Sequence, residues 1–272
     1  MMYTAFSTGS LFPLEPEKAA IVASDAGYKE IELFVNCDYE QSDDYIDLFL
    51  PLLEERGMKV HSFHPYLSGT ESYILFSNYP RRRREAIATY KHSIRAASRL
   101  GAKCFILHGP GRPAASCRAP FDYEIEVYKE LCAYGESVGV EVLQENVKLF
   151  LSSFPEYFRI LSEKVPELGF NLDLKQAAQS GQEYEDVIAA MGKKIRNVHI
   201  NDLDASGRCR LPGDGHLDYQ HVFDLLDDVG YDGALVTEVY RSDFEDYDRI
   251  QISRQFLESE LAKFRIIHQK FS

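Results

Sequence analysis

Six acidic or imidazole side chains stand at the ends of short apolar segments of this chain, where an unpaired charge would be costly. Glu238, for example, follows the apolar run at 234–236 in the segment DGALVTEVYR. The other five are His64, His108, Glu145, Asp173 and His199. Carboxylates and imidazoles gathered in one place need a compensating cation, and this ligand mixture suits Mn²⁺, Mg²⁺, Co²⁺, Fe²⁺ or Zn²⁺. The residue types predict one divalent metal ion, provided that the fold brings them together.

A repeated pattern along the chain could do this. A helical pattern, a glycine and a run of β-branched and apolar residues recur in that order, with the glycines at 27, 57, 101, 139, 169 and 230. Glycine suits the end of a helix because it adopts the left-handed conformation at least cost. Apolar runs without alternation suit a parallel sheet covered on both faces. The pattern therefore indicates a βα repeat in which each glycine separates a helix from the next strand.

The repeat occurs eight times. We expect strands at 3–8, 30–35, 60–65, 104–109, 140–146, 168–173, 195–202 and 234–240, and helices near 15–26, 43–56, 81–100, 121–138, 153–164, 182–192, 218–229 and 243–268. Eight pairs without a G-x-G-x-x-G after the first strand favour a closed α/β (βα)₈ barrel over an open doubly wound sheet. No Pro- or Ser-rich linker divides residues 1–272, so one domain is predicted. The carboxyl ends of barrel strands meet on one face, which would gather the six residues.

Composition restricts the partners. A net charge of −13 opposes a nucleic-acid partner, and the basic segment PRRRRE at 80–85 is interpreted as a solvated helix start. No segment approaches the ~18 uninterrupted apolar residues of a membrane helix. The first residues lack a basic region followed by a long apolar run, and the five cysteines are odd in number without a C-x-x-C pair. We therefore expect a cytoplasmic protein with reduced cysteines, and leave a homo-oligomer open.

At these strand ends the sequence resembles the xylose isomerase-like barrel superfamily, which contains sugar phosphate isomerases and epimerases, ketose 3-epimerases, inosose dehydratases and endonuclease IV. The resemblance is most specific in VEVLQENV, LGFNLDLKQAAQSG, IRNVHINDLD and LPGDGHLDYQHVFDLLDDVGYDGALVTEVY, between 140 and 241. In the family a strand-5 Glu, a strand-6 Asp, a strand-7 His and a strand-8 Glu hold one divalent metal. The matching residues are Glu145, Asp173, His199 and Glu238.

The chain departs from endonuclease IV at the extra metal ligands. That enzyme resembles it but uses a D-x-x-H on strand 6 and a D-x-H after strand 7. Here Gln176 stands where the strand-6 histidine belongs, and the loop LDASGRCRLPGDG contains no D-x-H. Together with the acidic charge, these departures argue against nuclease activity.

The resemblance implies a metal-assisted aldose–ketose isomerisation or epimerisation of a small sugar, sugar phosphate or polyol. A divalent ion on adjacent carbonyl and hydroxyl oxygens acidifies the carbon between them and stabilises the enediolate. Glu145 and Glu238 are each expected to be both a ligand and an acid/base, a purely structural ligand being the alternative for Glu238. An inosose-type dehydratase and a non-catalytic sugar-binding barrel are the alternative functions.

Five further residues are candidate substrate ligands. His64 and His108 could bond a substrate hydroxyl or support a metal ligand, satisfied core histidines being the alternative. Arg241 could anchor a phosphate or carboxylate, with a surface arginine as the alternative. His216 could reach the mouth from a loop that contains Gly213 and Gly215.

Lys175, the fifth, follows strand 6 by two residues. A lysine near the end of strand 6 of a barrel can form a Schiff base in metal-independent aldolases. Such a lysine must be desolvated or lie near another cation to be nucleophilic, whereas the acids expected near Lys175 would raise its pKa. A solvent-facing loop lysine is therefore the expected alternative. Asn201 and Asp202 could orient ligands, Asp202 alternatively bonding loop backbone, and Asp218 is expected to cap a helix. Loops such as 67–80 and 111–120 are expected to set specificity.

Overall fold

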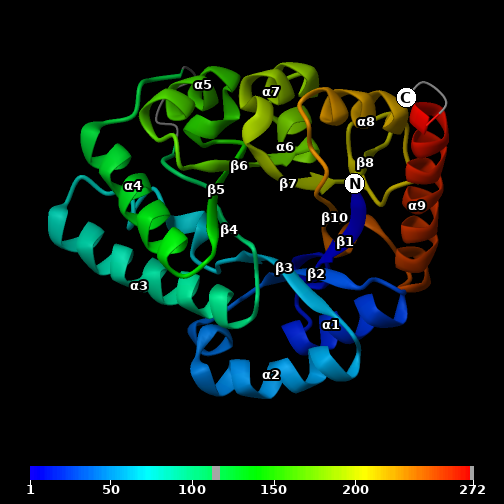
Figure 1. The fold of residues 1–272 in the computed structure, drawn as a ribbon, viewed down its shortest axis with the longest axis horizontal. Helices are drawn as coiled ribbons and strands as arrows, with labels where there is room; N and C mark the ends of the chain where they lie inside the picture. The colour runs from blue at the N-terminus through cyan, green and yellow to red at the C-terminus, as the bar shows by residue number, and fades with distance from the viewer. Residues whose placement is uncertain (112–116, 270–272) are drawn as a thin grey trace.

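The computed structural model describes residues 1–111 and 117–269 of the chain, and within them the predicted barrel is confirmed. Its eight parallel strands close in the order β1-β10-β7-β6-β5-β4-β3-β2. The barrel strands are β1 (Tyr3–Ser7), β2 (Glu30–Phe34), β3 (Lys59–His64), β4 (Cys104–Leu107), β5 (Glu141–Glu145), β6 (Gly169–Asp173), β7 (Ile195–Ile200) and β10 (Ala234–Thr237). The strands lie inside a ring of helices (Figure 1).

The helices of the ring are α1 (Pro16–Asp25), α2 (Asp43–Glu55), α3 (Pro80–Arg99), α4 (Asp122–Ser137), α5 (Pro155–Lys164), α6 (Leu174–Gln179), α7 (Tyr184–Met191), α8 (Tyr219–Asp228) and α9 (Asp248–Gln269). Proline begins α1, α3 and α5, where its missing N–H costs no helical hydrogen bond. The Asp218 side chain accepts a hydrogen bond from His221 N, so the predicted cap of α8 is confirmed.

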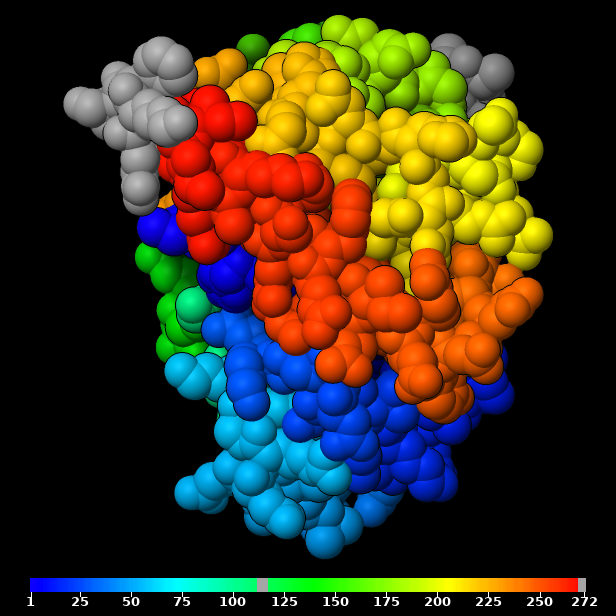
Figure 2. Space-filling view, turned by 90° about the vertical axis from the view of Figure 1, so that its right-hand side faces the viewer, coloured from blue at the N-terminus to red at the C-terminus, as the bar shows by residue number. Residues whose placement is uncertain are grey.

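Helix α9 joins the end of the chain to its beginning. Figure 2 shows α9 (orange to red) lying across one side of the molecule beside the N-terminal segment. Arg265 donates to the Met2 carbonyl at 2.7 Å, and Arg254 donates to the Ala26 carbonyl at 2.8 Å. These contacts fasten the last helix over β1 and α1.

Three sequence predictions need correction. The predicted repeat omits α6, and it extends strand 7 to residue 202, where a short hairpin instead forms from β8 (Asp202–Leu203) and β9 (Cys209–Arg210). Gly169 does not end a helix: it begins β6, and an added Cβ would lie 2.5 Å from Leu143 Cδ2. The other five of these glycines have the expected positive φ. Close packing between strands, rather than backbone freedom, therefore explains glycine at 169.

The interior of the barrel changes from apolar to polar towards the carboxyl ends of the strands. Side chains two residues apart on a strand lie on the same face. Leu143 and Glu145 therefore share one face of β5, and Val236 lies on the same face as Glu238, just past the end of β10. Ala5, Ala234 and Val236 form a small apolar cluster. Apolar layers below the strand ends therefore support a polar layer at the mouth.

Candidate metal centre and active site

Four predicted ligands meet at this mouth. His199 Nδ1 lies 3.3 Å from Glu145 Oε1, 3.6 Å from Asp173 Oδ2 and 3.3 Å from Glu238 Oε2. One ligand atom from each of the four residues lies within 4.8 Å of the others. The structure thus brings together the set expected from the sequence, although Glu238 lies just beyond its strand and keeps 13% of its side chain exposed.

These residues fit a divalent ion. Among the residues that the structure describes, Glu145 Oε2 and Asp173 Oδ2 are buried oxygens that accept no hydrogen bond of ordinary geometry and have only imidazole or ammonium nitrogens 3.2–3.6 Å away. Asp173 uses its other oxygen, Oδ1, to accept a hydrogen bond from Gln176 N at the start of α6. Buried acceptors are rarely left unpaired, and carboxylate oxygens with one imidazole nitrogen form an ordinary ligand set for a divalent metal. Glu145, Asp173, His199 and Glu238 could therefore hold the ion.

Glu32, on β2, is a component of the site that sequence reasoning missed. Its side chain is fully buried, and its Oε2 lies 2.9 Å from His199 Nε2. Ser62 donates to the same oxygen at 2.8 Å, and Asn197 donates to it at 3.4 Å. Burial raises the pKa of Glu32, but His199 and His64 together lower it by more, so the carboxylate is ionised and accepts the Nε2 proton. This contact leaves Nδ1 of His199 facing the three other carboxyls.

The sequence indicated a solvent-facing loop lysine at position 175, but the structure buries the Lys175 side chain. It lies in the first turn of α6, is 3% exposed and places Nζ 2.9 Å from Glu238 Oε2 and 3.6 Å from Asp173 Oδ2. Nζ also lies 4.7 Å from the ring centroid of Tyr240. The unpredicted helix turns the side chain back into the barrel mouth, where the two acids balance its charge. Although burial lowers it, these acids raise the pKa of Lys175 well above its usual value, as anticipated.

The charges of the site set the ionisation of its carboxyls. Burial raises the pKa of Asp173 to about 6 against the opposing effect of Lys175. Burial also opposes ionisation of Glu145 and Glu238, but His199 beside Glu145, and Lys175 with His199 beside Glu238, hold the pKa of each well below its usual range. Burial lowers the pKa of His199, yet the surrounding carboxylates raise it well above its ordinary value. Two protein cations therefore balance the acids, and metal binding would release a proton from His199.

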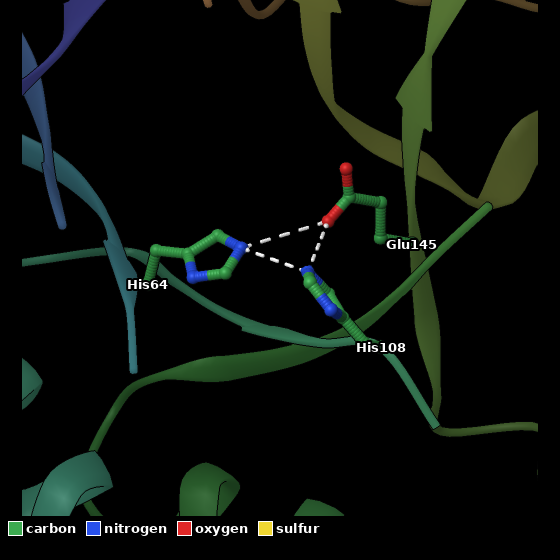
Figure 3. Close-up of side chains that lie close together, drawn as sticks. All are labelled: His64, His108 and Glu145. Atoms are coloured by element: carbon green, nitrogen blue, oxygen red, sulfur yellow. Dashed lines mark hydrogen bonds and ion pairs between the residues drawn. The ribbon is translucent and has the colours of Figure 1, made fainter. Parts of the chain in front are cut away.

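A second cluster adjoins the first and shares Glu145 with it. His64 and His108 point towards Glu145 and towards each other (Figure 3), with 3.1 Å between their Nε2 atoms. Glu145 Oε2 lies 3.6 Å from His64 Nε2 and 3.2 Å from His108 Nε2. These three residues also have the spacing of metal ligands. Both predicted imidazoles therefore reach the mouth, where they can donate to a bound molecule or hold an ion.

The remaining candidate ligands lie in the loops. Arg241 donates to the Phe244 carbonyl at 2.7 Å and the Glu245 carbonyl at 3.0 Å, and its guanidinium lies over the rings of Phe244 and Tyr247. Its planar group is thus held by its own loop. His216 is exposed, and its backbone N–H donates to the Leu203 carbonyl. Among the described residues, neither cluster around Glu145 includes His216, and Arg241 donates to the carbonyls of its own loop.

Asp202 orients loop backbone. Its Oδ1 accepts from Leu203 N and Leu217 N, and its Oδ2 accepts from Gly213 N at 3.1 Å. Of the two roles considered for Asp202, the structure shows the backbone one. Gln176 is similarly occupied, because its Oε1 accepts from Lys148 N at 3.0 Å. The arginines of PRRRRE lie at the start of α3, where Arg81, Arg82 and Arg84 are exposed as predicted.

The fold and site place this chain in a known class. Residues 21–260 match the family described as xylose isomerase-like TIM barrel, and the chain belongs to that family.

Comparison with individual proteins gives more distant relationships. The chain is 26% identical over 262 residues to an uncharacterised protein of Mycobacterium leprae, covering 87% of this chain and 88% of that protein. It is 28% identical over 135 residues to an inosose dehydratase of Yersinia enterocolitica, which covers 42% of this chain and 45% of the dehydratase. A solved L-ribulose 3-epimerase superposes with a TM-score of 0.81 at 17% identity, covering 100% of this chain and 98% of that one. No helix among the described residues is long and apolar enough to cross a membrane.

Proposed function

We propose that the protein is a divalent-metal-dependent isomerase or epimerase of a small sugar, sugar phosphate or polyol. The observation that carries this proposal is the set of four ligand atoms, from Glu145, Asp173, His199 and Glu238, within 4.8 Å of one another at the barrel mouth. Family membership and the resemblance in fold to an L-ribulose 3-epimerase support the same reaction class. Five free thiols support a reducing, cytoplasmic location.

The two glutamates supply the proton transfer. Their strands β5 and β10 are separated by β6 and β7, so the side chains approach the mouth from different sides. Both have a pKa well below the usual range, so each is ionised and able to accept a proton from carbon. The metal ion, when bound, supplies a positive charge that acidifies the C–H next to a carbonyl. One glutamate removes that proton, and the other, after it takes a proton from solvent, delivers that proton to the opposite face, which gives epimerisation; return of the first proton to the neighbouring carbon gives isomerisation.

His64, His108 and Lys175 are proposed to bind substrate oxygens. All three are held near the carboxylates of the proposed metal site, His64 and His108 beside Glu145 and Lys175 beside Glu238. Lys175 carries three N–H donors, so it can contact a substrate oxygen while it remains paired with Glu238. Arg241 and His216 are proposed only as outer contacts for a phosphorylated substrate, because both lie in loops of the same face.

A second candidate is dehydration of an inosose-like cyclic polyol. The 28% identity to an inosose dehydratase over 135 residues favours it. The same glutamates would remove a proton from carbon, but a neighbouring hydroxyl would then leave as water after protonation. Product mass distinguishes the two reactions, because isomerisation conserves mass and dehydration removes one water.

The test is turnover of a panel of ketoses, aldoses and inososes before and after chelation. We expect activity to disappear with the metal and to return on adding Mn²⁺ or Co²⁺. Full turnover after complete metal removal would overturn the mechanism. Wild-type protein that binds a sugar without turnover, and a Glu145→Gln variant that binds it equally well, would instead show a non-catalytic sugar-binding barrel.

A further inference from the structure

A large pocket lies beside the proposed catalytic site and is used by no step above. Its volume is about 820 Å³, and the described residues that line it come from the loops after β3, β4 and β5 and from the first turns of α3 and α4. Small-molecule sites commonly measure about 300–1,000 Å³, so this pocket is roomy for a single sugar.

Exposed apolar side chains line this pocket. Tyr73 is 72% exposed, Phe121 is 51% exposed and Leu149 is 64% exposed. Each comes from a different βα loop, so the gathering results from the tertiary structure. Large apolar side chains that remain exposed around one pocket mark a ligand-binding surface, whereas single exposed apolar side chains are common on any protein.

The backbone conformation of Leu149 also supports a binding role for this pocket. Its φ is +69°, and it is the single residue other than glycine with a positive φ in the described chain. A leucine in the left-handed region carries steric strain that the fold must offset elsewhere, and such strain gathers at functional sites. Burial of the Leu149 side chain in the core does not offset this strain, because the side chain is exposed. The structure therefore holds an apolar side chain in the pocket at a conformational cost.

The pocket shares a wall with the catalytic mouth. Phe150 lines it, and the same ring packs edge-on against His108 with 5.5 Å between ring centroids. Leu151 N donates to the Pro110 carbonyl at 2.9 Å, and Gly111 pairs with Phe150, so the loops after β4 and β5 are joined there. A molecule that reaches His108 from the loop side would thus extend naturally over Phe150 into the pocket.

The polar groups of the pocket favour a neutral, hydroxyl-rich ligand. Arg118 forms a two-pronged ion pair with Glu124, with contacts of 2.7 and 2.8 Å, so its charge is balanced. Arg82, which donates to the Tyr73 carbonyl at 3.3 Å, and the exposed Asn78 offer donors. A phosphate would be expected to meet several unpaired cations rather than aromatic rings. Apolar faces with a few polar edges match a sugar ring, whose C–H faces are apolar and whose hydroxyls lie at its rim.

We propose that this pocket binds a second sugar ring, so that the substrate is a glycoside of the reacting sugar rather than a free monosaccharide. This inference rests on the proposed function, because that function places the reacting sugar at the barrel mouth beside the pocket. The second ring stacks against Tyr73, Phe121 and Leu149, while the reacting carbons lie beside Glu145 and His108 on the other side of Phe150.

The absence of tryptophan from the sequence makes a direct binding test possible. Tyr73→Trp introduces a single tryptophan into the pocket, and Tyr39→Trp places one in the loop after β2, at a tyrosine that is 54% exposed and outside the pocket lining. Each variant, loaded with Mn²⁺, is titrated with fructose and with lactulose, leucrose and isomaltulose. These disaccharides carry a second ring on O4, O5 or O6 of fructose and leave its C2 and C3 free.

We expect at least one disaccharide to change the emission of the Tyr73→Trp variant and not that of the Tyr39→Trp variant. It should bind at least about tenfold more tightly than fructose, a difference of about 1.4 kcal/mol. Leu149→Gly removes the apolar side chain and relieves the positive φ, so it should keep the melting temperature while reducing the preference at least threefold. Leu48→Ala, which shortens an exposed leucine on α2, should change neither.

Equal affinity for fructose and all three disaccharides, with silent Tyr73→Trp emission, would overturn the pocket inference. Turnover of the same sugars separates this failure from failure of the proposed function. Turnover of fructose with a silent pocket refutes the second-ring site alone. A responsive pocket without any turnover refutes the isomerase and leaves the sugar site standing, while silence in both assays refutes both.

Discussion

Oε2 of Glu32 lies 2.9 Å from Nε2 of His199, although their strands β2 and β7 lie three positions apart around the barrel ring. This contact crosses the barrel interior and fixes the imidazole so that Nδ1 faces Glu145, Asp173 and Glu238. Carboxylates behind metal-bound histidines hold the ring orientation and raise its basicity. Glu32 is therefore expected to position His199 without touching the substrate.

Glu32→Gln should weaken metal binding about 10- to 100-fold, because the amide cannot stabilise the Nε2 proton as the carboxylate does. Isothermal titration of the metal-free protein with Mn²⁺ measures this directly. Glu30→Gln, on the same strand but 3.5 Å from His61, is the matched control and should bind the metal normally. Normal affinity in the Glu32→Gln variant would show that packing alone holds His199.

The protein should bind one divalent ion per chain. Three carboxylates surround His199 Nδ1 and complete a set of four donors. The second cluster has only three donors, shares Glu145 and has its two imidazoles within hydrogen-bonding distance of each other. Elemental analysis of wild type and of His64→Gln should both give about one equivalent. Two equivalents in wild type and one in the variant would place a second ion at the cluster of Figure 3.

Glu145→Gln and Glu238→Gln should both slow exchange of the substrate C–H with solvent. General acid–base catalysis contributes about 10²–10⁴-fold, so a loss in that range is expected at saturating metal. Deuterium incorporation from D₂O, followed by NMR alongside metal content, separates ligation from proton transfer. If Glu238→Gln retains both its metal and its exchange rate, Glu238 is neither an essential ligand nor a base.

Lys175→Met should destabilise the metal-free protein much more than the metal-loaded one. Loss of Nζ leaves Glu238 and Asp173 without their buried partner, and breaking such a pair costs about 3–5 kcal/mol. A bound divalent ion would supply the missing positive charge. Urea unfolding with EDTA and with Mn²⁺ measures the difference.

Lys194→Met is the control, because Lys194 Nζ donates to the Val165 and Leu168 carbonyls away from the site. Its effect on the free energy of unfolding should be the same with and without the ion. An equal loss of stability in both conditions for Lys175→Met would contradict a charge-balancing role.

Glu71 should make stability fall as the pH rises towards neutrality. Burial raises its pKa from 4.5 to about 7, although Gly109 N and Tyr90 donate to it. The folded state therefore holds a proton that the unfolded state has released. This contribution is complete below pH 4.5 and is lost as the pH rises through about 7. Relative to Glu71→Gln, wild type should lose about 3 kcal/mol across that range.

Unfolding in urea between pH 4.5 and 8 measures this change for both proteins. Glu141→Gln, at a half-buried carboxyl on β5, is the control and should show a weaker dependence. A wild-type curve parallel to that of Glu71→Gln would show that Glu71 is ionised throughout.

The sequence was a good guide where one strand could be judged by itself. Each apolar run specifies a strand, and each polar residue at its end stands out as a charge that needs a partner. Glu238 and His199 were found in this way, and the barrel order follows from eight consecutive repeats. Lys175 was misjudged because the six-residue helix α6 has no amphipathic pattern long enough to recognise, and it decides where that side chain points.

The sequence by itself determined the barrel, the donor types and four residues of the proposed metal site, because strand ends in a closed parallel barrel must share one face. Only the tertiary structure decided which donors touch. Glu32 lies inside its strand, and only closure of the ring brings it to His199. The loops after β3, β4 and β5 likewise form their pocket only in space. These contacts join residues far apart in the chain, and no local pattern records such a distance.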